Sequence, residues 1–270
     1  MMSGGPRALG GSVEDVRDPE MAACHIGGAM AAIEASVYEI KDAVLAVVDR
    51  YDAQVGHPNR GDLEALQPLL ERLLESHRGL VAGAGFVVEP GIICDAREWL
   101  EWRMGRRGSF ARLEVTLDSN SLTHYDYLHA AWYEGPRSGA DRTLTGPYVD
   151  LGGVNQYIVT LTIPVTLGSR FLGVAGADVL VDRVEVILRH LTRAMSRGAI
   201  VLTEEGRILA SSVPSQHPGA LIHGVDLSVE SGQTAAPGLV AYRCGSLPWT
   251  LLVAEPAHSN DHAARTASLN

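Results

Sequence analysis

The sequence has few cysteines, which argues against a disulfide-stabilised protein and against a zinc-binding one. Its 270 residues include only three cysteines, an odd number. Cys24, Cys94 and Cys244 lie far apart, with no CxxC pair and no Cys/His ligand spacing. The pattern favours reduced, packed thiols, and it predicts neither a disulfide framework nor a metal site.

Basic residues and long uncharged apolar runs are also scarce. The formal net charge of -10 argues against nucleic acid as a partner, because phosphate binding needs clustered Lys and Arg. The most apolar helical stretch, residues 22–48, carries Glu34, Glu39, Lys41 and Asp42, so it is not expected to span a membrane. The first twelve residues lack the apolar core of a signal peptide. We therefore expect a cytoplasmic protein with no membrane partner.

Motifs of common enzymes are missing as well. The chain has no GxSxG, no HExxH, no P-loop and no GxGxxG that follows a strand and opens a helix. The two glycines between Gly173 and Asp178 lie inside a strand pattern, where they cannot cradle a phosphate. We expect no catalysis and no cofactor. A carboxylate pair of Asp150 and Asp178 acting on a glycoside is the weaker, enzymatic alternative.

A long helix is predicted near the N-terminus, from about Asp18 to Tyr51. Its apolar residues follow spacings of 4, 3, 4, 3, 4 and 3, which form a heptad seam. The seam consists of Ile26, Met30, Ile33, Val37, Ile40, Val44 and Val47. Two interpretations are open: the seam packs on its own domain, or it pairs with a second copy in a homodimer. A second, leucine-rich helix is expected to begin at Asp62, which can cap it.

The pattern changes to strands after Gly83. Residues 84–94 predict a hairpin with its turn at Pro90-Gly91, and residues 124–134 predict a short helix. Three further strands, joined by glycine-containing turns, predict an antiparallel meander. They span residues 143–150, 157–166 and 170–180.

A reduced form of the same scheme follows after Gly198. Residues 199–210 again predict strand, turn and strand, and residues 238–243 and 249–254 complete a smaller sheet. The fold class is therefore α+β, with a long N-terminal helix followed by two modules with antiparallel sheets. The predicted organisation is a flexible leader (1–17), two helices (18–80), a first module (81–196), a second module (197–256) and a disordered tail (257–270).

Aromatic and acidic residues gather within the first module. Tyr125-Asp126-Tyr127, Trp132-Tyr133, the segment Gly146–Asp150 and Asp178 follow one another within about fifty residues. Aromatic faces and carboxylates in one cup suit a ligand that carries a cationic amine. No nucleophile with its base accompanies them, so the cluster indicates binding rather than catalysis.

The order of these motifs resembles the double Cache sensor domains, PAS-like ligand-binding regions of bacterial chemoreceptors and histidine kinases. The resemblance covers about residues 20–255 and is most specific over 125–180. That family normally lies between two transmembrane helices and signals to an output domain. The resemblance here is to a free-standing form, whose output partner is a separate regulator chain or a second copy.

The amino-acid-binding branch of that family implies roles for individual residues. Its motif is a tyrosine, an arginine two residues before a Trp-Tyr pair, a Tyr-x-Asp and a final aspartate. The matching positions here are Tyr125, Trp132, Tyr133, Tyr148, Asp150 and Asp178. Asp126 adds a third acid to the candidate ligand-binding set, and His129, beside the arginine position, completes it. For His129, a surface or packing role is the favoured alternative.

The arginine position itself holds Ala130. In the family this arginine grips the ligand carboxylate, while acids and aromatics hold the ammonium. Losing a charge-assisted pair costs about 1.5–3 kcal/mol, so the change shifts the expected ligand from an amino acid toward an amine.

Two alternatives stay open. A substitute among Arg97, Arg103, Arg106 and Arg107 would allow a carboxylic acid. A Cache fold that has lost its ligand would be a dimeric adaptor.

Overall fold

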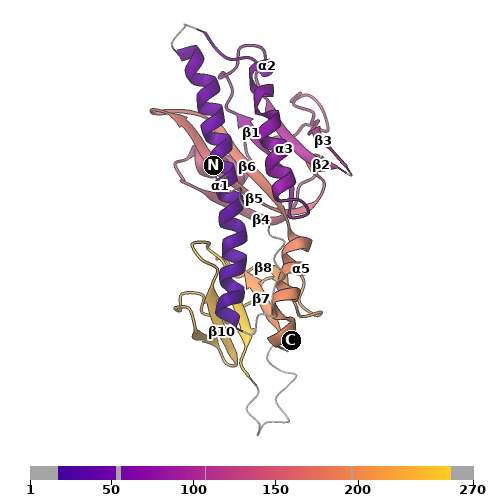
Figure 1. Cartoon of the computed structure of the whole chain (residues 1–270), viewed down its shortest axis with the longest axis vertical. Helices are drawn as coiled ribbons and strands as arrows, with labels where there is room; N and C mark the ends of the chain where they lie inside the picture. Colours follow the sequence, from indigo (N-terminus) through magenta and orange to yellow (C-terminus); the bar gives the residue numbers. More distant parts are fainter. Residues whose placement is uncertain (1–17, 53–55, 107, 196, 257–270) are drawn as a thin grey trace, which may run out of the picture. The chain divides into compact units, whose positions relative to one another are not determined.

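The computed structural model describes residues 18–52, 56–106, 108–195 and 197–256 (Figure 1). The leader expected at 1–17 and the tail expected at 257–270 lie outside the described residues. The chain divides into two compact units. One is Met30–Arg183, and the other combines the described residues before Met30 with those after Arg183.

The predicted N-terminal helix is α1, Pro19–Asp52. All seven residues of the heptad seam are buried within the single chain, with exposed fractions of 0–3%. Of the two interpretations, the seam therefore packs on its own chain. The homodimer expected through the N-terminal helix stays a prediction, and it would have to use residues of α1 outside this seam.

The second helical region consists of three short segments instead of one helix. They are α2 (Arg60–Leu63), the 3-10 helix η1 (Glu64–Leu66) and α3 (Gln67–Ser76). The N-cap is Asn59, and the expected cap, Asp62, occupies the third helical position. The Asn59 side chain accepts from the Asp62 backbone N–H, and the Asp62 carboxylate accepts from the Asn59 N–H. This capping box satisfies two backbone donors, which a cap at Asp62 alone could not do.

The first sheet has six antiparallel strands in the order β3-β2-β1-β6-β5-β4. The meander predicted for its last three strands is confirmed. The strands are β1 (Val81–Val88), β2 (Leu100–Arg106), β3 (Ser109–Arg112), β4 (Thr143–Val149), β5 (Tyr157–Leu167) and β6 (Arg170–Leu180).

The hairpin predicted over 84–94 is wrong. Strand β1 ends at Val88, and Ile92 and Ile93 lie in a bend, although both are only 5% exposed. Both edges of β1 are already paired, one with β2 and the other with β6. Apolar residues after the turn therefore pack into the core without joining a ladder, since a strand has only two edges.

The two faces of the first sheet are covered by different helices. Arg103 of β2 donates to Gln67 of α3 on one face, whereas the neighbouring Trp102 packs with Trp132 on the other. Trp132 belongs to α4, Ala131–Arg137, which begins seven residues later than the helix predicted from 124. Residues 124–130 thus form an irregular connection, and Tyr125 is fixed there by its backbone N–H, which donates to the Thr116 carbonyl at 2.8 Å.

The second sheet has five antiparallel strands in the order β8-β7-β11-β10-β9. It follows α5 (Val181–Thr192) and the 3-10 helix η2 (Arg193–Met195). Its strands are β7 (Ala199–Leu202), β8 (Ile208–Ser211), β9 (Gln233–Ala236), β10 (Leu239–Arg243) and β11 (Thr250–Ala254). The sequence did not predict β9, an edge strand whose side chains are mostly exposed.

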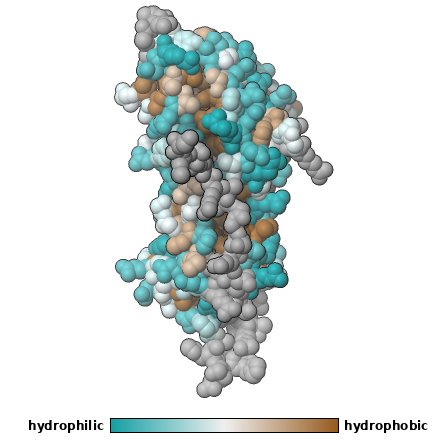
Figure 2. Space-filling model, in the orientation of Figure 1, coloured by the Kyte–Doolittle hydropathy of each residue, from teal (hydrophilic) through white to brown (hydrophobic). Residues whose placement is uncertain are grey.

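The surface mixes hydrophilic and hydrophobic residues, and hydrophilic ones are frequent on the face that Figure 2 shows. Few large apolar side chains are strongly exposed; among them are Val149 and Leu151 of the first module. None of the helices in the described parts of the chain combines the length and the apolar character that a membrane crossing requires.

Candidate functional site

Two adjoining cavities lie on the α4 side of the first sheet. The inner cavity has a volume of only about 10 Å³, room for roughly one water molecule. The outer cavity, which we call the basin, has a volume of about 300 Å³. The two share Tyr125, Trp132, Tyr148 and Asp150. The inner cavity is further lined by Val87, Leu100, Trp102, Leu113, Thr160 and Asp178, and the basin by His124, Asp126, Tyr127, Ala130, Val149 and Leu151.

Glycines make room for the indole that walls the inner cavity. A Cβ atom at Gly83 would lie 2.5 Å from Trp102 Nε1, and one at Gly176 would lie 3.3 Å from Trp102 Cη2. A Cβ at Gly85 would collide with the Glu101 carbonyl oxygen and would lie 2.7 Å from Trp102 Cα. Strands β1 and β6 therefore need glycine at these positions for the indole to lie across them.

Asp178, on β6, is one of the two buried acids that line the inner cavity. Its side chain is 5% exposed, and its Oδ1 accepts from Thr160 Oγ1 at 2.8 Å. Burial, and secondly the nearby Asp150, raise the pKa of Asp178, which lies at about 8. Thr160 and the Trp102 indole act in the opposite direction and lower this pKa. The indole Nε1 nevertheless has no partner at hydrogen-bonding geometry among the described residues.

Asp150, which follows β4, has a richer set of donors. Its Oδ1 accepts from the Tyr125 hydroxyl at 2.9 Å, and its Oδ2 accepts from the Val154 backbone N–H at 2.7 Å. The second bond closes a tight turn, in which a Cβ at Gly153 would collide with the Asp150 carboxylate. The turn holds this carboxylate at the boundary between the inner cavity and the basin.

Two tyrosines act as hydroxyl donors in the site. Since Thr160 gives its only proton to Asp178, Tyr148 donates to Thr160 Oγ1, at 2.8 Å. Burial is the largest cause that raises the pKa of Tyr125 and of Tyr148, and the two carboxylates add to it. Both hydroxyls therefore stay protonated and serve as donors.

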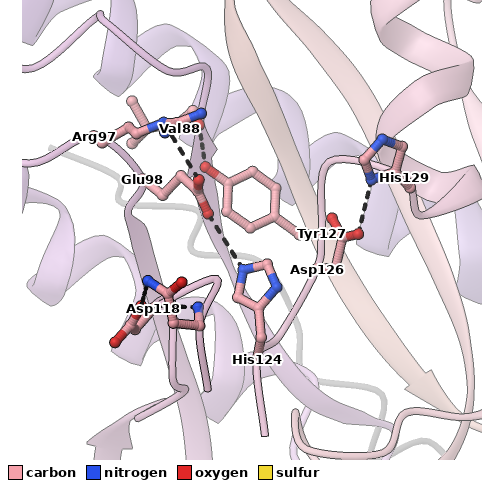
Figure 3. Close-up of polar contacts among 9 residues, drawn as sticks. Val88, Arg97, Glu98, Asp118, His124, Asp126, Tyr127 and His129 are labelled. Atoms are coloured by element: carbon pink, nitrogen blue, oxygen red, sulfur yellow. Dashed lines mark hydrogen bonds and ion pairs between the residues drawn. The ribbon is translucent and has the colours of Figure 1, made fainter. Parts of the chain in front are cut away.

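Figure 3 shows the polar contacts of His124, Asp126 and Tyr127, three residues that line the basin. His124 Nε2 lies 3.8 Å from Glu98 Oε2, and Arg97 Nε lies 3.8 Å from Glu98 Oε1. Asp126 accepts from His129 Nδ1 at 2.7 Å, and this bond is the main cause that lowers the pKa of Asp126. Both members of the Asp126–His129 pair are well exposed, with 46% and 78% of their side chains accessible.

The structure brings most of the predicted site residues together. Tyr125, Trp132, Tyr148, Asp150 and Asp178 line the inner cavity, and Asp126 lines the basin. His129 lines neither cavity. Tyr133 is fully buried elsewhere, where its hydroxyl donates to Glu89 Oε2 at 2.6 Å and its ring packs edge-on against Tyr127, Trp132 and Phe171.

Four residues of the cavities with polar groups were not among the predicted set, and one of them, Tyr127, belongs to the Tyr-Asp-Tyr motif. Thr160 alternates with buried apolar residues on β5 and gave no signal in the sequence. For Trp102, only the glycines of β1, which is the neighbouring strand, indicate its place. His124 precedes the Tyr-Asp-Tyr motif, and this adjacency could have revealed it.

Among the described residues that line the two cavities there is no arginine or lysine. Ala130, at the position of the expected arginine, lines the basin. Of the four substitutes considered, Arg103 pairs with Glu101 on the opposite face, and Arg97 is mostly exposed. The side chains of Arg106 and Arg107 lie outside the description. Within the described residues, no group of three or more His, Cys, Asp and Glu side chains could hold a metal.

Comparison with known families identifies the first module. Residues 66–185 match the family described as methyl-accepting chemotaxis protein-like, first PDC sensor domain. The methyl-accepting chemotaxis protein PscA of Pseudomonas syringae pv. tomato is 29% identical over 90 residues, which are 33% of this chain and 14% of PscA. PctB of Pseudomonas aeruginosa is 28% identical over 85 residues, 32% of this chain and 13% of PctB. The matched segments are thus small parts of these relatives.

Solved structures show the same fold over most of the chain. The ligand-binding domain of PctB, solved in complex with L-Arg, has a TM-score of 0.59 at 17% identity and covers 93% of this chain and 95% of that domain. The ligand-binding domain of PctC, solved in complex with GABA, has a TM-score of 0.56 at 18% identity, with coverages of 87% and 95%. The resemblance predicted from the sequence is confirmed: residues 66–185 match a PDC sensor-domain family of chemoreceptors, and most of the chain has the fold of chemoreceptor ligand-binding domains.

Proposed function

We propose that this protein is a small-molecule sensor that binds an organic ammonium ion through Asp150 and Asp178. One observation carries the proposal: two buried acids line a small aromatic cavity, and none of the described residues that line it with them is basic. A buried carboxylate without a cation is costly, so a cationic ligand supplies an interaction that these residues do not.

The shape of the two cavities supports the same ligand class. The inner volume suits a group about as large as water, such as a primary ammonium, and nothing larger. The basin has the volume of a small-ligand site and is flanked by the exposed Val149 and Leu151. The ammonium would enter the inner cavity, with the organic part between Trp132 and Tyr148 and in the basin.

The ligands of the structural relatives bear on this choice. L-Arg and GABA, bound in PctB and PctC, each carry an amine and a carboxylate. The described residues that line the cavities offer two acids to the amine and no arginine or lysine to the carboxylate. This difference favours an amine over an amino acid.

A matched ligand series tests the proposal. Thermal unfolding is measured with propylamine, propionate and 1-propanol, and then with polyamines and amino acids. An amine at 100 times its dissociation constant stabilises the protein by about 2.7 kcal/mol, whereas propanol has no effect. If only carboxylic acids stabilise it, a substitute arginine binds them and the ammonium proposal is wrong. If nothing does, the non-binding adaptor is favoured.

Two tyrosine variants serve as a matched pair. Tyr148→Phe removes the hydroxyl that donates to Thr160, and it should weaken amine binding about 2–10-fold. Tyr133→Phe removes a hydroxyl of the same kind from the core, where it should lower the free energy of unfolding by about 1–2 kcal/mol and leave the amine affinity unchanged. Equal losses of affinity in both variants would place the ligand elsewhere.

Signalling and location in the cell stay predictions. The sequence predicted a cytoplasmic protein that acts through a second copy or a separate regulator chain. Since the seam of α1 is buried, a dimer through this helix would have to use its outer face, where Tyr38 is 43% exposed. Binding would act by a population shift between two states of differing affinity. Chemical crosslinking with and without an amine tests whether a ligand changes self-association.

A further inference from the structure

We infer that Asp150 and Asp178 hold a single proton between them when no ligand is bound, that Asp178 carries it, and that an arriving ammonium ion displaces it to solvent. The displacement of the proton by an ammonium ion rests on the proposed function, whereas the shared proton does not. The displacement adds to that function a dependence of binding on pH.

The surroundings of the two acids make them unequal. Asp150 accepts two hydrogen bonds, from Tyr125 and from the Val154 backbone, which stabilise its charged form. Asp178 accepts one, from Thr160 through Oδ1, while the Trp102 indole favours its charged form without reaching hydrogen-bonding geometry. Double ionisation of two carboxylates in one buried cavity is unfavourable without a cation, so the less supported acid keeps the proton. Oδ2 is the atom left to carry it.

The other groups that face Asp178 do not supply a countercharge. Tyr148 on β4, Thr160 on β5, Trp102 on β2 and Tyr125 in the connection before α4 are all neutral. On β1, the residue paired with Asp178 is Gly83, which has no side chain. Among the described residues, Asp150 is the charge that acts on Asp178, and the raised pKa of about 8 agrees with this geometry.

The proton balance of binding follows. At neutral pH the amine arrives as R–NH₃⁺ and Asp178 is a neutral acid. On binding, the O–H bond of Asp178 breaks, its proton leaves to solvent, and the carboxylate pairs with R–NH₃⁺. Affinity therefore rises roughly tenfold for each pH unit between about 6 and 7 and levels off above about 8.

Carboxyl NMR of the full chain with ¹³C-labelled aspartate tests the free state. One aspartate signal should titrate near pH 8 and vanish in Asp178→Asn. Thr160→Val removes the hydroxyl that lowers this pKa, so the signal should titrate at a higher pH. The matched control is Thr143→Val, because the Thr143 hydroxyl is buried without a partner, and it should leave the titration unchanged. A wild-type protein without any aspartate that titrates above pH 6 would overturn the inference.

Calorimetry with propylammonium tests the displacement. Titrations at pH 7 in buffers of different ionisation enthalpy should show about one proton released per ligand bound, and Asp178→Asn should release none. Binding of equal affinity at pH 6 and pH 8, with no proton release, would leave the proposed function standing and this inference wrong. A signal near pH 8 with no binding at any pH would establish the shared proton, exclude its displacement and refute the proposed function.

Discussion

The two sheets of this protein share one topology and differ in what fills their faces. The second sheet runs β8-β7-β11-β10-β9, and the first runs β2-β1-β6-β5-β4 with β3 added at the edge. In each, the first strand lies inside the sheet, beside the last. The internal repeat that the sequence predicted is thus a repeat of strand order. Because the order is common to both sheets, differences between them come from their side chains.

Side chains account for the difference. On the second sheet Ile200, Leu202 and Leu252 form an apolar core cluster with residues of the connection before β9, among them Ile222 and Leu227. On the first sheet, glycines of the central strands make room for Trp102, and one acid lies on β6 and another directly after β4. The second core is aliphatic, whereas the cavity on the first sheet is lined by an indole and two carboxyl groups as well as by aliphatic side chains.

The largest expected effect comes from adding a side chain at Gly85, one of the glycines of β1 that lie against Trp102. Gly85→Ala places a methyl group against backbone atoms of Glu101 and Trp102, which cannot rotate away. It should lower the free energy of unfolding by about 2–3 kcal/mol, measured by urea denaturation. Gly105→Ala is the matched control, because a Cβ there meets nothing within 4 Å. Equal free energies of unfolding for the two variants would show that position 85 does not need glycine.

A smaller and pH-dependent effect is expected from Asp178, a buried acid of the first sheet. The pKa of Asp178 is raised from 3.8 to about 8 in the folded protein, so the wild type loses stability as the pH rises between these values. Asp178→Asn cannot ionise and should be more stable than the wild type by at least about 1 kcal/mol at pH 8, with little difference at pH 4. Melting temperatures of both proteins across this pH range test the expectation. A difference between the two melting temperatures that stays constant with pH would contradict it.

The smallest effect is expected in the second sheet, where one cation stabilises the covering connection. The Arg243 guanidinium donates to the carbonyls of Leu227 and Val229 at 2.6 and 3.1 Å. Arg243→Met should cost about 1 kcal/mol and speed hydrogen exchange in residues 222–231. Amine affinity should not change, since the cavities belong to the first module. A weakened affinity would mean that the two modules do not act independently.

Local patterns in the sequence predicted the strongly periodic elements. The helix α1 and the strands β4, β5 and β6 appeared where their periodicity placed them, because burial of one face repeats along each element. The hairpin at 84–94 and the cap at Asp62 were wrong, since they depend on which edge of β1 is free and on how two backbone donors are satisfied.

The same division holds for the site. The sequence by itself determined which acids and aromatics are present, that the arginine position holds Ala130, and therefore the expected ligand class. Only the tertiary structure decided that Tyr133 faces the core while Trp102 and Thr160 face the cavity. It also decided that Asp150 has two donors and Asp178 has one. Residue identity fixes the chemistry of each group, but its charge state depends on neighbours from distant strands, which no local pattern specifies.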